Sequence, residues 1–403
     1  MLKITEIETV RLDNMPNLIW VNVKTDQGLI GLGETFFGAA AVEAHIHEYI
    51  ADYLLGQNAL EIERHSHRMT GYVGRGGSGA EMRAMSAVDI ALWDLLGQYS
   101  NQPLYQVLGG ASRDRIRVYN TCAGYNYVRK PAAQVTANFG LNPSSATGPY
   151  EDLEGFLNEA GELAQSLLDM GINGMKIWPF DFAAEASGGT YISKQQLKTA
   201  ILPFEKIRAA VGDKMEIMCE LHSLWNVPTA KLICNALEDF DLTWIEDPVR
   251  MDHLGNVGKI TASSKTPIAV GELLGGRGQF RDLIEKSDLG LVIMDIVWGG
   301  GLTEARKVAA YCDFHSLPFS GHDCTGPVAL AASTHMAMHA PNIFVQEVVR
   351  AFYYDWYQEL VTNLPPIDNG YISAPEGSGL GMALNPDVYK RQDLRVRTSK
   401  LGE

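Results

Sequence analysis

The chain has 403 residues, of which 46% are hydrophobic and 20% charged, a composition typical of a soluble globular protein with a large core. Its formal net charge is −15 at pH 7 and its lysines and arginines are scattered, which argues against nucleic acid or an anionic membrane as a partner. Because the N-terminus lacks a secretory pattern and the five cysteines form no CxxC pair, we expect a cytoplasmic protein.

The N-terminal part of the chain predicts strands followed by helices. Apolar residues alternate over 4–12 and over 17–36, where a hairpin turn separates two alternating runs. Helical spacing of apolar residues follows over 40–69 and again over 82–99. This order of elements predicts an α+β domain over residues 1–115.

The next part, residues 116–367, alternates short apolar runs with amphipathic helices, which predicts strand–helix units around a parallel sheet. Six of the runs end at an ionisable residue, and successive ones lie about 25 positions apart, the length of one such unit. These residues are Glu220, Glu246, Glu272, Asp295, His322 and Glu347. Because the carboxyl ends of the strands of a closed parallel barrel meet at one mouth, we expect these side chains to share a site.

Three of these residues, Glu220, Glu246 and Glu272, are carboxylates on consecutive predicted strands. Buried carboxylates are unfavourable unless a cation compensates their charge, and magnesium prefers oxygen ligands. We therefore expect the three to hold one Mg²⁺ per subunit; the alternative is that each is merely a polar residue at the start of a loop. Lys176, at the end of an earlier run, lies at the same relative place.

Two histidines are candidates for proton transfer. A metal that holds a substrate carboxylate makes the adjacent carbon-bound proton removable by a base. His322 is such a base, because Asp295, one unit earlier, would orient its ring. His222 follows Glu220 by two residues on the same face of the strand end. It is a candidate acid for a departing hydroxide, and the alternative is a hydrogen-bonding role outside the site.

The ordered motifs resemble the mandelate racemase and muconate lactonizing enzyme branch of the enolase superfamily, over essentially the whole chain. They are SAVDIALWDLLGQY, MKIW, CELH, WIEDP, VGE, MDIVWGGGLTEARK, SGHDCTGP and VQE. The resemblance implies a modified (β/α)₇β barrel, a modified TIM barrel, over residues 116–367. It also implies an α+β capping domain formed by residues 1–115 together with the C-terminal tail, 368–403.

The resemblance also implies roles for single residues. The three glutamates would bind magnesium, Asp295 and His322 would form the base dyad, and Glu347 would hydrogen-bond the substrate carboxylate. Tyr72 and Arg75 lie in one of two capping-domain loops that would close over the substrate. Relatives are commonly dimers or octamers, so we expect a homo-oligomer that acts on a small carboxylate.

Two positions depart from the pattern of the branch. Its racemases often carry KxK on the second barrel strand, with the last lysine as a base; here Trp178 stands in that place and cannot accept a proton. Glu220 stands where aspartate is usual, and Glu220-x-His222 resembles the Asp-x-His of galactonate and mannonate dehydratases, in which the histidine protonates the leaving group. The rings of Trp178 and Trp298 are candidates for substrate binding or for barrel packing.

These features favour dehydration of an aldonate-type sugar acid by a hydro-lyase. His322 would take the C2 proton, magnesium and Lys176 would stabilise the enediolate, and His222 would assist loss of the C3 hydroxyl to give a 2-keto-3-deoxy acid. Two alternatives stay open. One is an epimerase, racemase or cycloisomerase of a hydroxy acid with Lys176 as a second base, and the other is a non-catalytic relative that binds metal and ligand.

Overall fold

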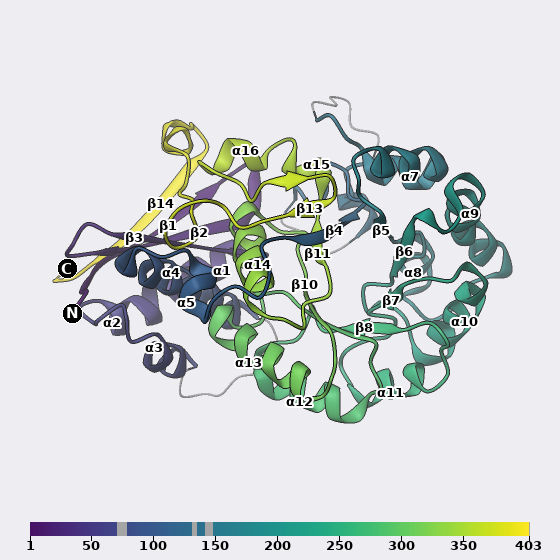
Figure 1. The fold of residues 1–403 in the computed structure, drawn as a ribbon, viewed down its shortest axis with the longest axis horizontal. Helices are drawn as coiled ribbons and strands as arrows, with labels where there is room; N and C mark the ends of the chain where they lie inside the picture. Colours follow the sequence, from purple (N-terminus) through teal and green to yellow (C-terminus); the bar gives the residue numbers. More distant parts are fainter. Residues whose placement is uncertain (71–78, 131–134, 142–147, 403) are drawn as a thin grey trace.

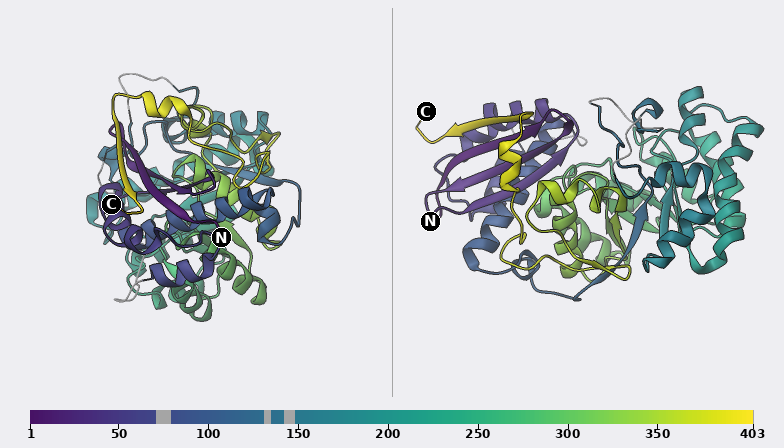
Figure 2. Two further views of the ribbon diagram at one scale, coloured as in Figure 1. Left: turned by 90° about the vertical axis from the view of Figure 1, so that its left-hand side faces the viewer. Right: turned by 90° about the horizontal axis from the view of Figure 1, so that it is seen from above.

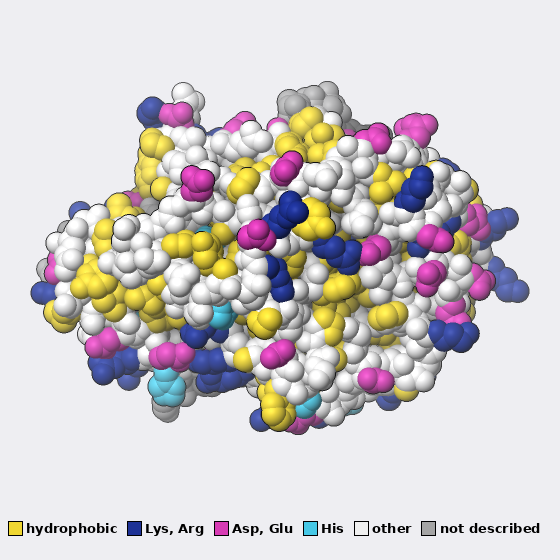
Figure 3. All heavy atoms as spheres, viewed as in Figure 1, with side chains coloured by type: hydrophobic (Ala, Val, Ile, Leu, Met, Phe, Trp, Pro, Cys, Tyr) yellow, Lys and Arg dark blue, Asp and Glu magenta, His cyan; other side chains and the backbone are white. Residues whose placement is uncertain are grey.

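A computed structural model describes residues 1–70, 79–130, 135–141 and 148–402 (Figure 1). A layer of antiparallel strands and helices lies at one end of an elongated molecule, and a ring of strands and helices forms the other. Both termini lie at the end formed by the first layer (Figure 2). Acidic and basic side chains are interspersed on the face shown in Figure 3. Among the described residues, no helix is long and apolar enough to cross a membrane.

The first layer is built on a four-stranded antiparallel sheet in the order β14-β1-β2-β3. Its strands are β1 (Ile4–Leu12), β2 (Met15–Thr25), β3 (Ile30–Phe36) and β14 (Leu394–Lys400). β14 comes from the C-terminal tail and pairs with β1 from Leu12↔Leu394 to Glu6↔Lys400. The tail therefore returns to the N-terminal sheet, and we call this sheet, with the helices of residues 39–108, the capping layer.

The helices of the capping layer cover one face of the sheet. They are α1 (Ala39–His45), the π-helix η1 (Ile46–Ile50), α2 (Ala51–Leu54), α3 (Ile62–Met69), α4 (Ala80–Ser100) and α5 (Leu104–Leu108). The helix expected over 40–69 is interrupted between α2 and α3, where Gly56 has a φ of 83°. α4 packs directly on β3, because a Cβ at Gly33 would lie 1.8 Å from the carbonyl oxygen of Ala87.

The second layer is the predicted parallel barrel. Its strands are β4 (Ile116–Thr121), β5 (Gly174–Ile177), β6 (Glu216–Glu220), β7 (Trp244–Glu246), β8 (Ile268–Val270), β9 (Leu291–Met294), β10 (Phe319–Gly321) and β11 (Gln346–Val348). They pair in parallel in this order, and β11 pairs with β4. A parallel bridge between Phe319 and Ile343 joins β10 to the segment before β11 and so completes the ring.

Helices surround the barrel (Figure 1). They are α6 (Asp152–Asn158), α7 (Ala160–Asp169), α8 (Asp181–Ser187), α9 (Lys194–Val211), α10 (Val227–Leu237), α11 (Gly255–Thr261), α12 (Gly276–Lys286), α13 (Gly301–Phe314), α14 (Pro327–His339), α15 (Arg350–Tyr353) and α16 (Tyr357–Leu360). Short 3₁₀ turns are η2 (Thr136–Asn138), η3 (Gly212–Lys214), η4 (Glu238–Phe240) and η5 (Pro386–Lys390), and the tail adds β12 (Ile367–Asp368) and β13 (Tyr371–Ile372).

The inside of the barrel is filled by side chains. A separate apolar cluster consists of Tyr119, Met218, Trp244, Ala269, Leu291, Ile293 and Val345. Met218 and Trp244 each lie two residues before a candidate metal ligand, so strand alternation points both pairs inward. The candidate metal ligands therefore lie directly above a packed layer of side chains inside the barrel, on the side of its mouth.

The capping layer is fixed to the barrel next to the loop after β9. The amide nitrogens of Gly300 and Thr303 donate hydrogen bonds to Ser86 (2.9 Å) and Asp89 (2.9 Å) of α4. Thr35 of β3 donates to the carbonyl oxygen of Val297 (2.6 Å). These contacts join the capping layer to the segment that follows Asp295. They therefore position the capping layer over the barrel mouth.

Candidate active site

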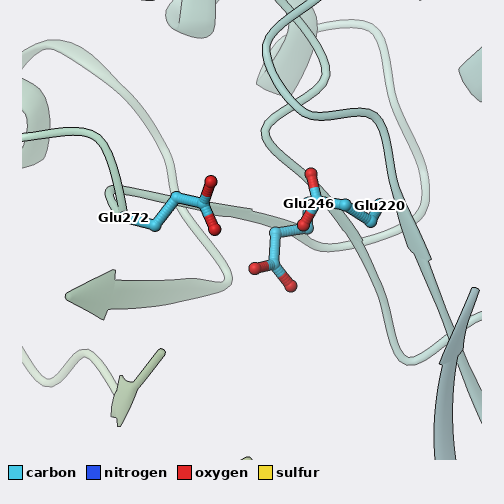
Figure 4. Close-up of side chains that lie close together, drawn as sticks. All are labelled: Glu220, Glu246 and Glu272. Carbon is cyan, nitrogen blue, oxygen red and sulfur yellow. The ribbon is translucent and has the colours of Figure 1, made fainter. Parts of the chain in front are cut away.

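The three glutamates expected to bind metal lie together at the carboxyl ends of β6 and β7 and just after β8. One carboxylate oxygen from each of Glu220, Glu246 and Glu272 lies within 4.8 Å of the other two. Glu272 approaches from the side opposite to Glu220, with Glu246 between them (Figure 4). All three residues are buried, with 1%, 0% and 6% of their surface exposed.

The electrostatics of this cluster fit a hard divalent cation. Burial raises the pKa of Glu220 and of Glu246, because ionised carboxyl groups lose hydration in the interior. Glu220 Oε2 has no hydrogen-bond partner among the residues that the structure describes. A divalent ion would give this oxygen a partner and add further positive charge to the cluster, and it prefers carboxylate oxygens.

Lys176, at the end of β5, lies beside the same cluster. Its Nζ lies 2.8 Å from Glu246 Oε1, 3.0 Å from Glu347 Oε1 and 3.5 Å from Glu220 Oε2. Burial lowers its pKa, but Glu246 and Glu347 outweigh this effect and raise the pKa well above its usual value. A lysine that is held as a cation by three carboxylates is poorly suited to accept a proton.

His322 and Asp295 are brought together on adjacent strands. His322 Nδ1 lies 2.8 Å from Asp295 Oδ2, and Nε2 lies 3.1 Å from Glu272 Oε2. The other oxygen of Asp295 accepts hydrogen bonds from the amide nitrogens of Val297 (2.8 Å) and Trp298 (3.0 Å). Asp295 is therefore fixed by the backbone and in turn fixes the ring of His322, so that Nε2 points toward the carboxylate cluster.

His222 lies at the opposite end of the cluster, just after β6. Its amide nitrogen donates to Glu220 Oε1 (2.6 Å), and its Nδ1 lies 2.8 Å from Asp181 Oδ2. Burial lowers the pKa of His222, but Asp181 and Glu220 outweigh burial and raise it to about 9. Asp181 was not among the residues expected from the sequence, where its only signal is an acidic residue three positions after Trp178.

Glu347 lies on β11 beside Lys176. Its Oε2 accepts a hydrogen bond from the amide nitrogen of Asp323 (2.8 Å), and its Oε1 accepts one from the hydroxyl of Thr121. Burial raises the pKa of Glu347, but Lys176 and His322 outweigh burial and lower it below its usual value. Glu347 is therefore held as an anion that accepts hydrogen bonds.

A cavity of about 220 Å³ opens over these groups. Trp178 and Trp298 both line it, and Trp178 also packs against Tyr127 and Phe156 at ring-centroid distances of 5.6 and 5.3 Å. Trp178 therefore packs into the wall of the cavity, and substrate binding by either tryptophan stays a prediction. Tyr72 and Arg75 lie outside the described residues.

Arg83 of α4 is a second cavity residue that was not expected from the sequence. Its guanidinium lies 4.4 Å from the ring centroid of Trp298 and lines the cavity together with Phe36 and Phe37. Burial lowers its pKa to about 10, while Asp295 and Glu272 act in the opposite direction. At neutral pH it therefore adds a positive charge to the cavity from the capping layer.

Comparison with known proteins identifies the family. The model described as "Mandelate racemase / muconate lactonizing enzyme, N-terminal domain" matches residues 7–109, and "Enolase C-terminal domain-like" matches residues 159–388. An enolase of the mandelate racemase subgroup from Agrobacterium tumefaciens is 48% identical, with 99% of each chain covered and a TM-score of 0.88.

Two curated relatives match nearly the whole chain. The D-xylonate dehydratase of Haloferax volcanii is 28% identical over 98% of this chain and 90% of its own length. The D-galactonate dehydratase of Ralstonia nicotianae is 29% identical over 95% of this chain and 92% of its own length. The family matches confirm the predicted modified TIM barrel with its capping domain. The chain belongs to the enolase superfamily, in its mandelate racemase and muconate lactonizing enzyme branch.

Proposed function

We propose that the protein is a hydro-lyase that dehydrates an aldonate-type sugar acid to a 2-keto-3-deoxy acid. Relatives that match almost the whole chain act, by name, on D-xylonate and D-galactonate, which supports this substrate class. The observation that carries the proposal is the placement of two histidines, His322 and His222, beside opposite ends of one cluster of three carboxylates. One histidine can take a proton from C2 while the other gives one to the hydroxyl on C3.

Glu220, Glu246 and Glu272 would hold one Mg²⁺ per subunit. When bound, the ion supplies positive charge that stabilises the negative charge developing on the substrate carboxylate. Lys176 adds a fixed ammonium group on the same side, where its three carboxylate neighbours keep it charged. The protein's own residues would thus stabilise the extra negative charge that the substrate carboxylate gains when the C2 proton is removed.

In the proposed reaction, Nε2 of His322 removes the C2 proton while Asp295 accepts a hydrogen bond from Nδ1. The electron pair of the C2–H bond first moves onto the substrate carboxylate as an enediolate, and it then forms the C2–C3 double bond as the C3–O bond breaks. His222 donates a proton to the departing hydroxide, so that water leaves. The resulting enol loses the proton of its C2 hydroxyl, gains a proton at C3 and so becomes the 2-keto-3-deoxy acid, and no oxidant or reductant is needed.

The proposed role of Glu347 differs from the one that the family resemblance implies. A hydrogen bond from Glu347 to a substrate carboxylate requires a proton on Glu347. Lys176 and Thr121 instead favour its ionised form, since one is a cation and the other a donor. We therefore assign Glu347 to holding Lys176 in place.

The test is a screen of sugar acids, including D-xylonate and D-galactonate, with Mg²⁺ present. A 2-keto acid that reacts with semicarbazide is the expected product, and stabilisation of the protein by each ligand is measured in parallel. A C2 epimer without any keto acid would instead indicate the isomerase alternative. Ligand stabilisation without any product would indicate the non-catalytic alternative, and either result would contradict dehydration.

The expected dimer or octamer is tested separately by light scattering.

A further inference from the structure

The surroundings of His222 match those of His322. Each histidine has Nδ1 at 2.8 Å from an aspartate oxygen, Asp181 Oδ2 for His222 and Asp295 Oδ2 for His322. Each ring also lies against a tryptophan of the cavity wall, at 5.8 Å from Trp178 and 5.1 Å from Trp298. Each histidine therefore has an aspartate oxygen at the same distance from Nδ1, although only the pair of His322 and Asp295 was evident from strand spacing.

The two pairs lie across the barrel from one another. His222 follows β6 and His322 follows β10, and three strands separate β6 from β10 in either direction around the ring. Because Nδ1 of each ring faces its aspartate, Nε2 faces the other way, and both histidines line the same cavity. A substrate between them would meet one Nε2 atom from each side.

Asp181 has no other evident reason to be buried. It is the first residue of α8, and only 2% of its surface is exposed. Within the described ranges, no other basic group lies within 4 Å of its carboxylate, and neither oxygen has a well-aligned hydrogen bond. A buried carboxylate is unfavourable without a partner. We therefore take the contact with His222 as the reason why Asp181 is buried at this position.

We propose that Asp181 is a positioning residue that holds His222 with Nε2 toward the substrate, and thereby completes a second His–Asp dyad. This inference rests on the proposed function, because it assigns the second dyad to loss of the C3 hydroxyl. The first dyad alone removes the C2 proton. Loss of Asp181 would then separate the two half-reactions, because only the step that needs His222 would slow.

One test needs no substrate. Long-range ¹H–¹⁵N spectra of the full-length protein with Mg²⁺ report on Nδ1 of each histidine, and the signal that disappears in His222→Asn belongs to His222. Asp181→Asn is expected to shift that Nδ1 signal, because the carboxylate beside it becomes a neutral amide. Glu185→Gln on the same helix is the matched control and should leave it in place. An unshifted His222 signal in Asp181→Asn overturns the proposal.

A second test uses D-xylonate and D-galactonate in deuterated water. In Asp181→Asn, kcat for dehydration should fall about 10- to 100-fold, as for other residues that orient a reacting side chain, with little change in KM. Recovered substrate should still gain deuterium at C2, because His322 and Asp295 are unchanged. Asp295→Asn should instead slow both exchange and dehydration.

The outcomes separate the two proposals. Equal loss of exchange and dehydration in Asp181→Asn, or loss of neither, contradicts the positioning role. If the unmodified protein turns over no sugar acid while the His222 signal shifts as expected, the dyad stands and the proposed function fails. If turnover is present but the signal does not shift, the proposed function stands and the positioning role fails.

Discussion

Lys176 places its ammonium group 2.8 Å from Glu246, one of the carboxylates proposed to bind magnesium. Both side chains are almost fully buried, and Glu220 lies 3.5 Å from the same ammonium group. The lysine and a bound magnesium ion would therefore act on one cluster of negative charge, and each would lower the unfavourable energy of burying it. Removal of the lysine charge should make the stability of the folded protein depend more strongly on bound Mg²⁺, and the reverse should also hold.

The variant Lys176→Met tests this relationship. Without added metal it should lose about 3–5 kcal/mol of unfolding free energy, the usual effect of removing one partner from a buried ion pair. With Mg²⁺ the loss should be smaller, so Mg²⁺ should raise the midpoint of thermal unfolding more in the variant than in the parent. Lys265→Met, at an exposed lysine, is the control that should behave like the parent. Equal stabilisation of parent and variant by Mg²⁺ would contradict the shared role.

The variant His322→Asn tests the base. Because His322 is the group placed to take the C2 proton, exchange of that proton with deuterated water should fall by about 10²- to 10⁴-fold, the usual contribution of a general base. Proton NMR of a turned-over sugar acid measures the exchange, and calorimetric titration should show that Mg²⁺ still binds. His315→Asn, at an exposed histidine, should exchange as the parent does. Undiminished exchange in His322→Asn would refute the assignment.

The residues that the sequence could place are those on a regular spacing. Glu220, Glu246 and Asp295 each end a strand or follow it directly, so one repeat length was enough to bring them to one mouth. Asp181 lies four positions past the end of β5, and a turn before α8 brings it back toward His222. Strand periodicity contains no information about such a turn, so the first dyad was predictable and the second was not.

Contacts between the capping layer and the barrel could likewise not be predicted from the sequence. Arg83 reaches the cavity from α4, and Trp298, on which it stacks, is more than two hundred positions away in the chain. The position of Arg83 in the cavity depends on how the capping layer packs on the barrel. Hydrophobic spacing within either layer does not specify this packing. The resemblance to a known family supplied the existence of the capping domain, but it did not supply this residue.

Glu34 joins the two layers, and its substitution should weaken the fold. It is fully buried on β3, where it accepts hydrogen bonds from the indole of Trp20 (2.7 Å) and from the amide nitrogen of Ala329 (2.9 Å) in α14. Glu34→Gln has only one acceptor oxygen, so one donor loses its partner, which should lower the unfolding free energy by about 1–3 kcal/mol. Urea unfolding measures this value, with the exposed Glu48→Gln as the control. Equal unfolding midpoints for Glu34→Gln and the parent would show that this contact does not stabilise the fold.

His335 should make the fold sensitive to acid. It is fully buried in α14, where Nδ1 accepts a hydrogen bond from the amide nitrogen of Tyr105 (3.3 Å) and Nε2 donates one to the carbonyl oxygen of Leu380 (3.1 Å). This arrangement requires a neutral ring, and burial lowers its pKa to about 4, whereas an unfolded histidine has a pKa near 6.5. Between these values the unfolded chain binds more protons than the folded one, so stability falls as the pH is lowered through this window.

The loss attributable to His335 should be about 1.4 kcal/mol per pH unit, or about 2 kcal/mol between pH 6.5 and pH 5. Urea unfolding of the parent and of His335→Leu at several pH values from 7 to 4.5 measures it. The variant should be less stable than the parent at pH 7, because Leu380 and Tyr105 lose a partner, yet its stability should fall less steeply with acid. His253→Leu, at an exposed histidine, should keep the slope of the parent. If His335→Leu keeps that slope as well, the buried ring is not the source of the acid sensitivity.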